Sequence, residues 1–436
     1  MVFVPKPGKD PNLPKSYRPI SLSSFLLKTL ERQVNLHVQT KCELHYPLHF
    51  LQFAYIKGKS TELSVQHLVE KIEKSSANCI SIAAFLDIQG AFDNTNFHSI
   101  SNALSKRGIS RTIKRWTTNM LKDRQISCSL GGSTRTIVAS KGCPQGGVLS
   151  PLLWSLVIDD LLYELNNDDI FTIGYADDIA VIVSGKFSHT VIDLFKNALL
   201  RIINWCKAHG LSINPTKTAL LPFHTKRKLD LPQFTLQQTI IPYSDEGRHL
   251  GIKLDSKLSW NPHLLWTISK ARKALWTSRN LIGKKWGISP KMMKYILTSI
   301  VRPIVTYGCF IWWPVTKTQR SIKHCNALQR IACLLITGAT RSCPTTAIER
   351  IVGLTPLHLE IKATAAKTAI RLSQIGLIHN ERATHSRIVN QIPNWPGSRT
   401  DPRQTLDVDL ESSIRTRTYI SPWTQTQASS KQRCLL

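Results

Sequence analysis

The sequence has few acidic residues, no long hydrophobic run and no paired cysteines. It contains 28 Asp and Glu against 57 Lys and Arg, so its formal net charge is +29. No apolar run reaches the roughly 18 residues of a membrane span, so we expect no membrane partner. The ten cysteines lack paired spacing, which indicates free thiols in a reducing, intracellular compartment. Met1–Val4 leads directly into Pro5–Lys9, and we therefore expect no signal peptide.

The basic excess is typical of a protein that binds a phosphate backbone, and such binding depends strongly on salt. A ribosomal or membrane-surface role is the alternative that charge alone leaves open. The chain has 436 residues, of which 42% are hydrophobic. This length predicts roughly two to four domains or subdomains with a substantial core.

Two acidic residues lie at the tip of a predicted hairpin. Tyr175–Asp178 separates the apolar runs Ile170–Gly174 and Ile179–Val183. Adjacent carboxylates repel each other unless a cation lies between them, and Mg²⁺ prefers such hard oxygen ligands. A buried strand over Cys79–Leu86 delivers Asp87 to its C-terminal end. The pattern predicts a three-carboxylate, two-metal site, which is the apparatus of nucleotidyl transfer. A solvated Asp-Asp turn is the alternative.

Hydrophobic periodicity predicts the other elements. Helices are expected at 21–40 (with Ser23 or Ser24 as the N-cap), 61–74, 96–106, 111–123, 151–165 and 189–209, and a hairpin is expected at 125–139. From about residue 262 the chain is largely helical and rich in Trp with interleaved Lys and Arg. Because Trp at helical spacing is more often core, at most two or three of these are expected to touch nucleic acid. The tail from Pro393 is expected to be loosely ordered.

Seven blocks of the sequence occur in a characteristic order. They are Pro5–Lys9 with Tyr17–Ile20, Gln52–Thr61, Phe85–Asp87 with Gly90–Asp93, Cys143–Pro151, Tyr175–Asp178, Asn214–Thr218 and Leu250–Ile252. With these blocks, over about residues 3–255, the chain closely resembles the reverse transcriptases of non-LTR retrotransposons, in particular Jockey-like and related insect-type elements. A weaker likeness continues to about residue 360.

The resemblance implies an α+β fold, a right-hand polymerase with fingers and palm (an antiparallel sheet plus helices) and an α-helical thumb. We expect fingers in 1–80, a palm with inserted fingers elements in 81–260, a thumb in 261–345, and a helical extension with a loosely ordered tail in 346–436. The implied activity is RNA-directed DNA synthesis from dNTPs, an RNA template and a DNA primer, with two Mg²⁺ ions or Mn²⁺ in their place. The family's chromosomal priming implies residence in the nucleus.

The resemblance also assigns roles to single residues. Asp87 and Asp177 become the principal metal ligands, and Asp178 a less direct one. Phe92 is expected beneath the incoming sugar, where a bulky ring excludes a ribose 2′-hydroxyl; a packed core aromatic is the alternative. For Asp93, by contrast, a local cap or salt bridge is the better interpretation.

Other family positions bind the substrates. Tyr175, Gln145 and Gly146 are expected at the nucleotide, although Gly146 also fits a turn that needs a positive φ. Arg18 is expected at the triphosphate. Exposed basic loops remain the alternative for Arg18 and for its helpers Lys6, Lys9 and Lys15. The same alternative holds for Lys57 and Lys59, which flank Gly58 where template backbone is expected.

The last implied positions follow the hairpin. Lys217 matches the lysine that protonates pyrophosphate, with an ordinary surface lysine as the alternative. Leu250, Gly251 and Ile252 match the primer grip, for which a strand with a glycine bulge is the alternative. Cys309, His324, Cys325, Cys333 and Cys343 lack zinc-knuckle spacing, so we predict buried thiols and no structural zinc.

Three other interpretations remain open at this stage. Nothing in the sequence matches the endonuclease or RNase H domains that such elements carry, which leads us to expect a fragment. A catalytically silent remnant that only binds RNA is the alternative to an enzyme. A group II intron maturase or a telomerase is a third interpretation, but Gly90–Asp93 and Cys143–Pro151 fit the retrotransposon better.

Overall fold

The computed structural model describes residues 1–76, 79–130, 132–166, 170–215, 218–223, 231–232, 234–236, 239–281, 287–374, 376–377 and 388. The chain divides into two compact units. The first comprises residues 1–251 and 255–257, and the second comprises 252–254 and the described residues from 258 onward. Antiparallel strands and helices fill the first unit, and the second is almost entirely helical. The predicted α+β class is confirmed.

An antiparallel sheet forms the centre of the first unit. Its strands run in the order β6-β7-β3-β8, and β9 also pairs with β3. The bounds are β3 (Ile80–Gln89), β6 (Phe171–Tyr175), β7 (Asp178–Gly185), β8 (Ser212–Ile213) and β9 (Ala219–Phe223). The sequence predicted that the first strand ends at Leu86, but β3 continues to Gln89. It does so because Ile88 and Gln89 pair with Ile213 and Ser212 of β8.

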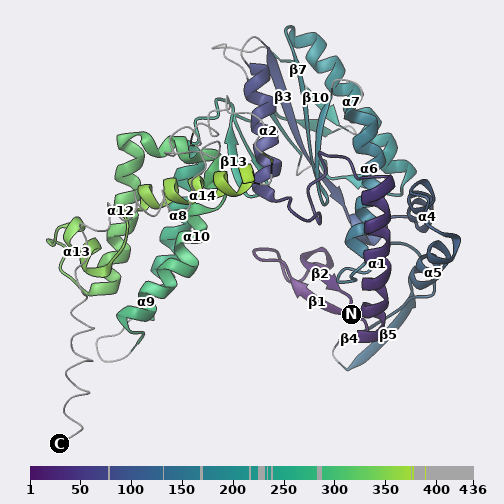
Figure 1. The fold of residues 1–436 in the computed structure, drawn as a ribbon, viewed down its shortest axis with the longest axis horizontal. Helices are drawn as coiled ribbons and strands as arrows, with labels where there is room; N and C mark the ends of the chain where they lie inside the picture. The colour runs from purple at the N-terminus through teal and green to yellow at the C-terminus, as the bar shows by residue number, and fades with distance from the viewer. Residues whose placement is uncertain are drawn as a thin grey trace, which may run out of the picture. The chain divides into compact units, whose positions relative to one another are not determined.

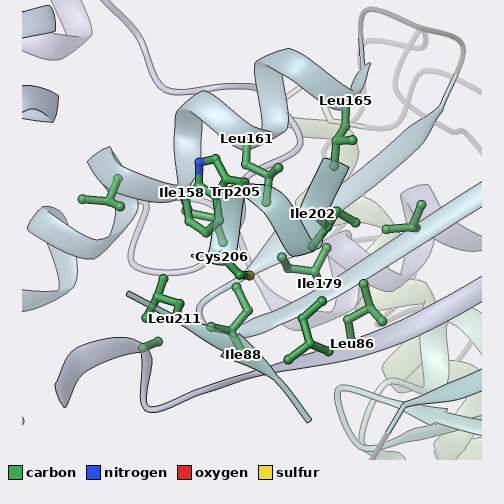
Figure 2. Close-up of a cluster of buried hydrophobic side chains, with 14 of the residues drawn as sticks. Leu86, Ile88, Ile158, Leu161, Leu165, Ile179, Ile202, Trp205, Cys206 and Leu211 are labelled. Atoms are coloured by element: carbon green, nitrogen blue, oxygen red, sulfur yellow. The ribbon is translucent and has the colours of Figure 1, made fainter. Parts of the chain in front are cut away.

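Two long helices cover one face of this sheet, α6 (Ser150–Asn166) and α7 (Ser188–Ala208) (Figure 1). Side chains alternate between the two faces of a strand, so Leu86 and Ile88 of β3 point to the helices together with Ile179 of β7. Figure 2 shows these residues packed against α6 and α7 side chains that include Leu161 and Ile202. This is the main hydrophobic core of the unit.

The opposite face is covered by α2 (Thr61–Ser76) and by β12 (Glu246–His249). The ammonium of Lys71 on α2 lies 5.5 Å from the ring centre of Phe171. On β12, the ring of His249 stacks on Phe85 with centroids 5.1 Å apart. Asp87 belongs to the same face as Phe85, because the two are two residues apart on β3.

The first unit also contains three separate two-stranded sheets and several further helices. They are β1 (Val2–Pro5), η1 (Pro14–Ser16), β2 (Tyr17–Ile20), α1 (Phe25–His45), α3 (Ala91–Asn94), α4 (Phe97–Lys106), α5 (Arg111–Lys122), β4 (Gln125–Leu130), β5 (Ser133–Val138), β10 (Phe234–Leu236) and β11 (Thr239–Ile241). Ser24 is the N-cap of α1, and its hydroxyl accepts a hydrogen bond from the Leu27 amide at 3.2 Å. This decides between the two predicted caps.

The second unit consists of helices that follow the short strand β13 (Ile252–Asp255). They are α8 (Asn261–Arg279), α9 (Pro290–Ile296), the π-helical η3 (Leu297–Val301), α10 (Arg302–Thr306), α11 (Cys309–Trp312), η4 (Trp313–Lys317), α12 (Gln319–Thr337), α13 (Thr345–Val352) and α14 (Leu357–Gln374). Trp312 and Trp313 are fully buried, whereas Trp276 is 46% exposed. Core packing therefore explains part of the Trp-rich region, as predicted.

Three of the predicted buried thiols of the second unit lie in its core, whereas Cys343 is only half-buried. Cys309, Cys325 and Cys333 are buried, and burial raises the pKa of the Cys325 and Cys333 thiols to about 12. These two thiols therefore stay protonated at neutral pH. Among the described residues, no single helix is long and apolar enough to cross a membrane, although the bent pair 290–306 and 309–317 reaches that length and composition together.

Candidate active site

The backbone brings the three predicted carboxylate residues to one end of the central sheet. In the strand register, Tyr175 of β6 is opposite Asp178 of β7, and Asp178 is opposite Asp87 of β3. Directly opposed residues of antiparallel strands present their side chains on the same face. Asp87, Asp178 and Tyr175 therefore form a row across three strands, on the face that α2 and β12 cover elsewhere. Asp177 precedes this row in the hairpin turn.

Backbone hydrogen bonds hold β3, the strand of this row that carries Asp87, from both sides. The Ile88 amide donates to the Asp177 carbonyl at 3.1 Å, and the Asn214 amide donates to the Asp87 carbonyl at 3.0 Å. The first bond joins β3 to the hairpin turn, and the second joins it to the segment after β8. The backbones that carry Asp87 and Asp177 are therefore fixed relative to each other.

The hairpin turn has a strained conformation and a dedicated support. Ala176 has a φ of 56°, in the left-handed region that is unfavourable for a residue with a Cβ atom. The Trp154 indole of α6 donates to the Ala176 carbonyl at 2.8 Å. Strained residues persist where the surrounding structure over-determines them, and they cluster at functional sites. Trp154 is a site residue that the sequence analysis missed, because nothing marks a tryptophan inside an apolar helix as a turn support.

The carboxylate row offers oxygen ligands of the kind that Mg²⁺ prefers. Among the described residues, no group of three or more His, Cys, Asp or Glu side chains could hold a metal ion by itself. Mg²⁺ at phosphoryl-transfer sites is typically held by one or two carboxylates together with substrate phosphates and water. Asp87 and Asp178, opposed across neighbouring strands, with Asp177 at the adjacent turn, provide such a partial ligand set.

The loop before α6 packs against the segment after β3. The Cys143 amide donates to the Phe92 carbonyl at 2.6 Å, and the Gly142 amide donates to the Thr95 carbonyl at 2.8 Å. A Cβ atom at Gly142 would collide with the Asp93 carbonyl. The loop is thereby tied to the residues that carry Phe92.

Gly146 has a positive φ, as expected if the glycine is needed for a turn. Its φ is 99°, and a Cβ atom there would lie 3.0 Å from the Ser21 carbonyl oxygen. The Ser21 amide in turn donates to the Gln145 carbonyl at 2.7 Å. Because Gly146 has no side chain, its backbone can lie close to the chain just after β2. A close approach of Gly146 to the nucleotide stays a prediction.

Gln145 and Asp93 form a pair that the sequence analysis did not predict. The Gln145 amide donates to the Asp93 carboxylate at 2.6 Å. Burial raises the pKa of Asp93, while this hydrogen bond and the charges of Arg124 and Lys6 act in the opposite direction. The carboxylate therefore fixes the orientation of the Gln145 amide. Asp93 was expected to form a cap or salt bridge, and its carboxylate instead accepts a hydrogen bond from Gln145.

Phe92 belongs to an aromatic series between two segments. Its ring centre is 6.4 Å from that of Trp154 and 6.4 Å from that of Tyr55, which it meets edge-to-face at 78°. Phe92 is half-buried, so one side of the ring packs and another side stays accessible. Both of its predicted roles, sugar contact and packing, are compatible with this position.

The basic residues expected at substrates fall into different environments. Arg18 is exposed on β2 opposite Val4. Lys6 is bound to its own loop, since its amine donates to the Lys15 carbonyl at 2.8 Å. Lys59 donates to the carbonyls of Phe50 and Gln52 at 2.6 and 2.8 Å, and burial lowers the pKa of its amine to about 8. Lys59 is therefore held by its own segment instead of lying in an exposed loop, and a contact with template backbone stays a prediction.

Two remaining predictions concern the end of the first unit. Lys217 lies outside the described residues, so its role stays a prediction. Leu250 and Gly251 form the turn after β12 with φ values of 46° and 82°, and Ile252 begins β13. The glycine is therefore in a turn rather than in a bulge. The primer-grip role of Leu250, Gly251 and Ile252 stays a prediction.

The residues that form this site match a known family. Residues 4–254 match the family described as reverse transcriptase (RNA-dependent DNA polymerase). The chain belongs to this family. The predicted resemblance and the right-hand polymerase fold are thereby confirmed, and reverse transcriptases generally use divalent metal ions. The match contains every predicted site residue from Arg18 to Ile252.

The chain is also similar to individual proteins of known sequence or structure. The chain is 28% identical to the probable RNA-directed DNA polymerase from transposon BS of Drosophila melanogaster, over 85% of this chain and 42% of that one. It is 26% identical to the RNA-directed DNA polymerase from mobile element jockey of the same species, over 86% of this chain and 41% of that one. The chain thus spans less than half the length of these relatives. Among solved structures, apo telomerase from Candida tropicalis aligns with a TM-score of 0.42 and 11% identity, covering 83% of this chain and 61% of that one.

Proposed function

We propose that the chain is the RNA-directed DNA polymerase of a non-LTR retrotransposon, which extends a DNA primer with dNTPs on an RNA template. The observation that carries the proposal is the carboxylate row. Asp87 and Asp178 oppose each other across β3 and β7, next to Asp177 at a strained and supported turn. Carboxylates placed in this way at a sheet end suit nucleotidyl transfer with two divalent ions.

In this proposal, Asp87 and Asp177 are the principal ligands of two Mg²⁺ ions, and Asp178 contributes less directly. When bound, the ions lower the pKa of the primer 3′-hydroxyl and neutralise the triphosphate charge. The protein residues hold the reactants in line. Phe92 lies beneath the incoming sugar, Gln145 and Gly146 contact the nucleotide, and Arg18 binds the triphosphate.

Further assignments rest on the family alone. Lys217 donates a proton to the pyrophosphate, Tyr175 contacts substrate, and Leu250, Gly251 and Ile252 hold the primer. Residues 1–80 act as fingers, 81–260 as palm, 261–345 as thumb and 346–436 as an extension. We also propose nuclear residence, which imaging of a fluorescent fusion in cells tests.

The test is primer extension by the purified chain on an RNA template with a DNA primer, Mg²⁺ and dNTPs. We expect extension that EDTA abolishes and that Asp177→Ala lacks. RNA binding, measured in parallel, should be unchanged by Asp177→Ala. If neither protein extends the primer although both bind RNA, the alternative of a silent RNA-binding remnant is correct and the proposal is wrong.

A further inference from the structure

The segment that precedes α2 is fixed against the catalytic hairpin. The Phe53 amide donates to the Gly174 carbonyl at 3.0 Å, and the Gly174 amide donates to the Leu51 carbonyl at 3.1 Å. The Gln52 side chain donates to the Ser155 carbonyl of α6 at 3.1 Å. Together with the Lys59 hydrogen bonds, these contacts anchor residues 50–59 to β6 and α6. Gly174 directly precedes the Tyr175–Asp178 turn.

Within this anchored segment, Tyr55 has an unfavourable backbone. Its φ is 61° although it carries a bulky ring, and this left-handed region is an outlier for such a residue. Burial of the ring does not explain the conformation, because Tyr55 is 50% exposed. A strained, half-exposed aromatic residue that its neighbours hold in place is typical of a ligand-contacting position.

Tyr55 is close to residues that are expected to contact the substrate. Its ring meets Phe92 edge-to-face at 6.4 Å. Burial raises the pKa of the Tyr55 phenol, and the nearby charges of Asp177 and Tyr175 raise it further. Tyr55 therefore lies close both to the expected sugar gate and to the catalytic turn, although it comes from a different segment than either.

We propose that Tyr55 packs against the base pair formed by the incoming dNTP and its template base, as a second aromatic wall beside Phe92. The inference rests on the proposed polymerase function, which supplies this ligand. Aromatic rings contact base pairs irrespective of sequence, so such a wall accepts all four dNTPs. The anchoring of 50–59 holds the ring in place before the nucleotide arrives, which limits the ordering required on binding.

The conformation of Tyr55 permits an informative substitution. Tyr55→Gly removes the ring but suits the left-handed φ, so the variant should unfold at the same or a higher temperature than the wild type. Tyr55→Phe keeps the ring and removes only the hydroxyl. Tyr163→Ala serves as the control, because Tyr163 is an exposed tyrosine on α6 whose hydroxyl donates to the Pro47 carbonyl at 3.3 Å.

The measurement is the affinity of the complementary dNTP for the complex of the chain with an RNA template and a dideoxy-terminated DNA primer. This measurement does not require nucleotide addition, because the primer lacks a 3′-hydroxyl. We expect Tyr55→Gly to weaken dNTP binding by about tenfold, and to raise KM for dNTP in primer extension to a similar degree with little change in kcat. RNA affinity should be unchanged, and Tyr55→Phe and Tyr163→Ala should behave as wild type.

Equal dNTP affinity in wild type and Tyr55→Gly would overturn the inference. So would weaker RNA binding by Tyr55→Gly with unchanged dNTP affinity, because Tyr55 would then hold the template alone. A wild type that binds dNTP but does not extend an ordinary primer would contradict only the proposed polymerase function. In that case the binding comparison still decides the role of Tyr55.

Discussion

Phe92 connects the catalytic turn to the rest of the proposed nucleotide site. It contacts Trp154, which supports the turn, and Tyr55. If its ring excludes a 2′-hydroxyl, Phe92→Val should raise the ratio of ribonucleotide to deoxyribonucleotide efficiency by about tenfold or more, because removing a steric clash is worth about 1–3 kcal/mol. The measurement is kcat/KM for the two nucleotides in primer extension.

The matched control for this prediction is Phe187→Val. Phe187 is 64% exposed, directly precedes α7 and stacks on His189 with ring centres 5.8 Å apart. The control should leave discrimination unchanged. If Phe92→Val also leaves discrimination unchanged while losing stability, the ring is a packing residue and the alternative interpretation is correct.

His249 makes the stability of the first unit depend on pH. Its ring is 3% exposed and stacks on Phe85, and burial lowers its pKa to about 4. The folded protein therefore binds fewer protons than the unfolded chain between pH 4 and about 6.5. The His249 contribution is complete above pH 6.5 and is lost as the pH falls towards 4, by at most about 3 kcal/mol.

His249→Phe keeps the stacked ring and removes the titration. We expect the variant to be as stable as wild type at pH 7, or more stable, because the buried Nε2 atom of His249 has no hydrogen-bond partner among the residues that the structure describes. Urea unfolding between pH 7 and 4.5 should show a smaller loss of stability for the variant. Parallel pH curves for the two proteins would contradict the assignment.

At the residue level, the sequence identified the groups with recognisable chemistry. Asp87, Asp177 and Asp178 were predicted to converge, and the strand register brings them to one sheet end. The partners that hold such groups were not predictable, since Asp93 with Gln145 and Trp154 with Ala176 are joined only by the folded chain. Tyr55 was missed because a positive φ on a tyrosine has no signature in sequence.

At the level of elements, α1 and α6 are joined by one buried carboxylate. Glu31 of α1 is 1% exposed, and its carboxylate accepts from the amides of Val148 and Leu149 at 2.5 and 3.4 Å. These amides precede α6, where helix N-termini leave unpaired donors and favour negative charge. Glu31 therefore connects the start of α6, and the Gln145 loop before it, to α1.

Glu31→Ala should lower the free energy of unfolding by about 2–3 kcal/mol, because it leaves buried amides without an acceptor. Glu31→Gln retains an acceptor and should lose about 1 kcal/mol. Glu43→Ala, an exposed carboxylate on the same helix, is the control and should have little effect. Chemical denaturation measures all three, and equal stability of Glu31→Ala and Glu43→Ala would refute the proposed role of Glu31.

Most elements were predictable because the spacing of hydrophobic residues indicates which face of a helix or strand is buried. The predicted helices 61–74, 151–165 and 189–209 correspond to α2, α6 and α7 within two residues at each end. Boundaries that depend on distant partners were less accurate. The helix predicted at 21–40 extends to His45 as α1, and β3 runs beyond Leu86 because β8 supplies partners. Neither extension is marked by a signal in the neighbouring sequence.

At the level of the whole molecule, the net charge of +29 should control binding to nucleic acid. Binding to a phosphate backbone releases counterions, so we expect RNA affinity to fall by about tenfold or more between 0.1 and 0.3 M salt. Filter binding of a single-stranded RNA at several salt concentrations measures this. An uncharged peptide nucleic acid of the same sequence is the control, and equal salt dependence for both would contradict the expectation.

The global organisation was only partly predictable. A change from a mixed sheet-and-helix unit to a helical one was expected near residue 260, and along the chain the division between the two units falls within residues 251–258. The fingers, palm and thumb boundaries came from family resemblance and stay predictions. Composition alone predicted only a basic protein with a hydrophobic core. The ordered motifs were needed to predict that the protein is a polymerase.

The most direct test of the polymerase site is the single-turnover rate of primer extension by Asp87→Asn, with RNA affinity measured on the same protein. Asp160→Asn is the matched control, because Asp160 is a carboxylate of α6 that pairs with Lys106 at 2.7 Å. We predict that Asp87→Asn is slower by about a thousandfold or more, with RNA affinity unchanged and Asp160→Asn normal. Extension by Asp87→Asn at the rate of the wild type would contradict the account.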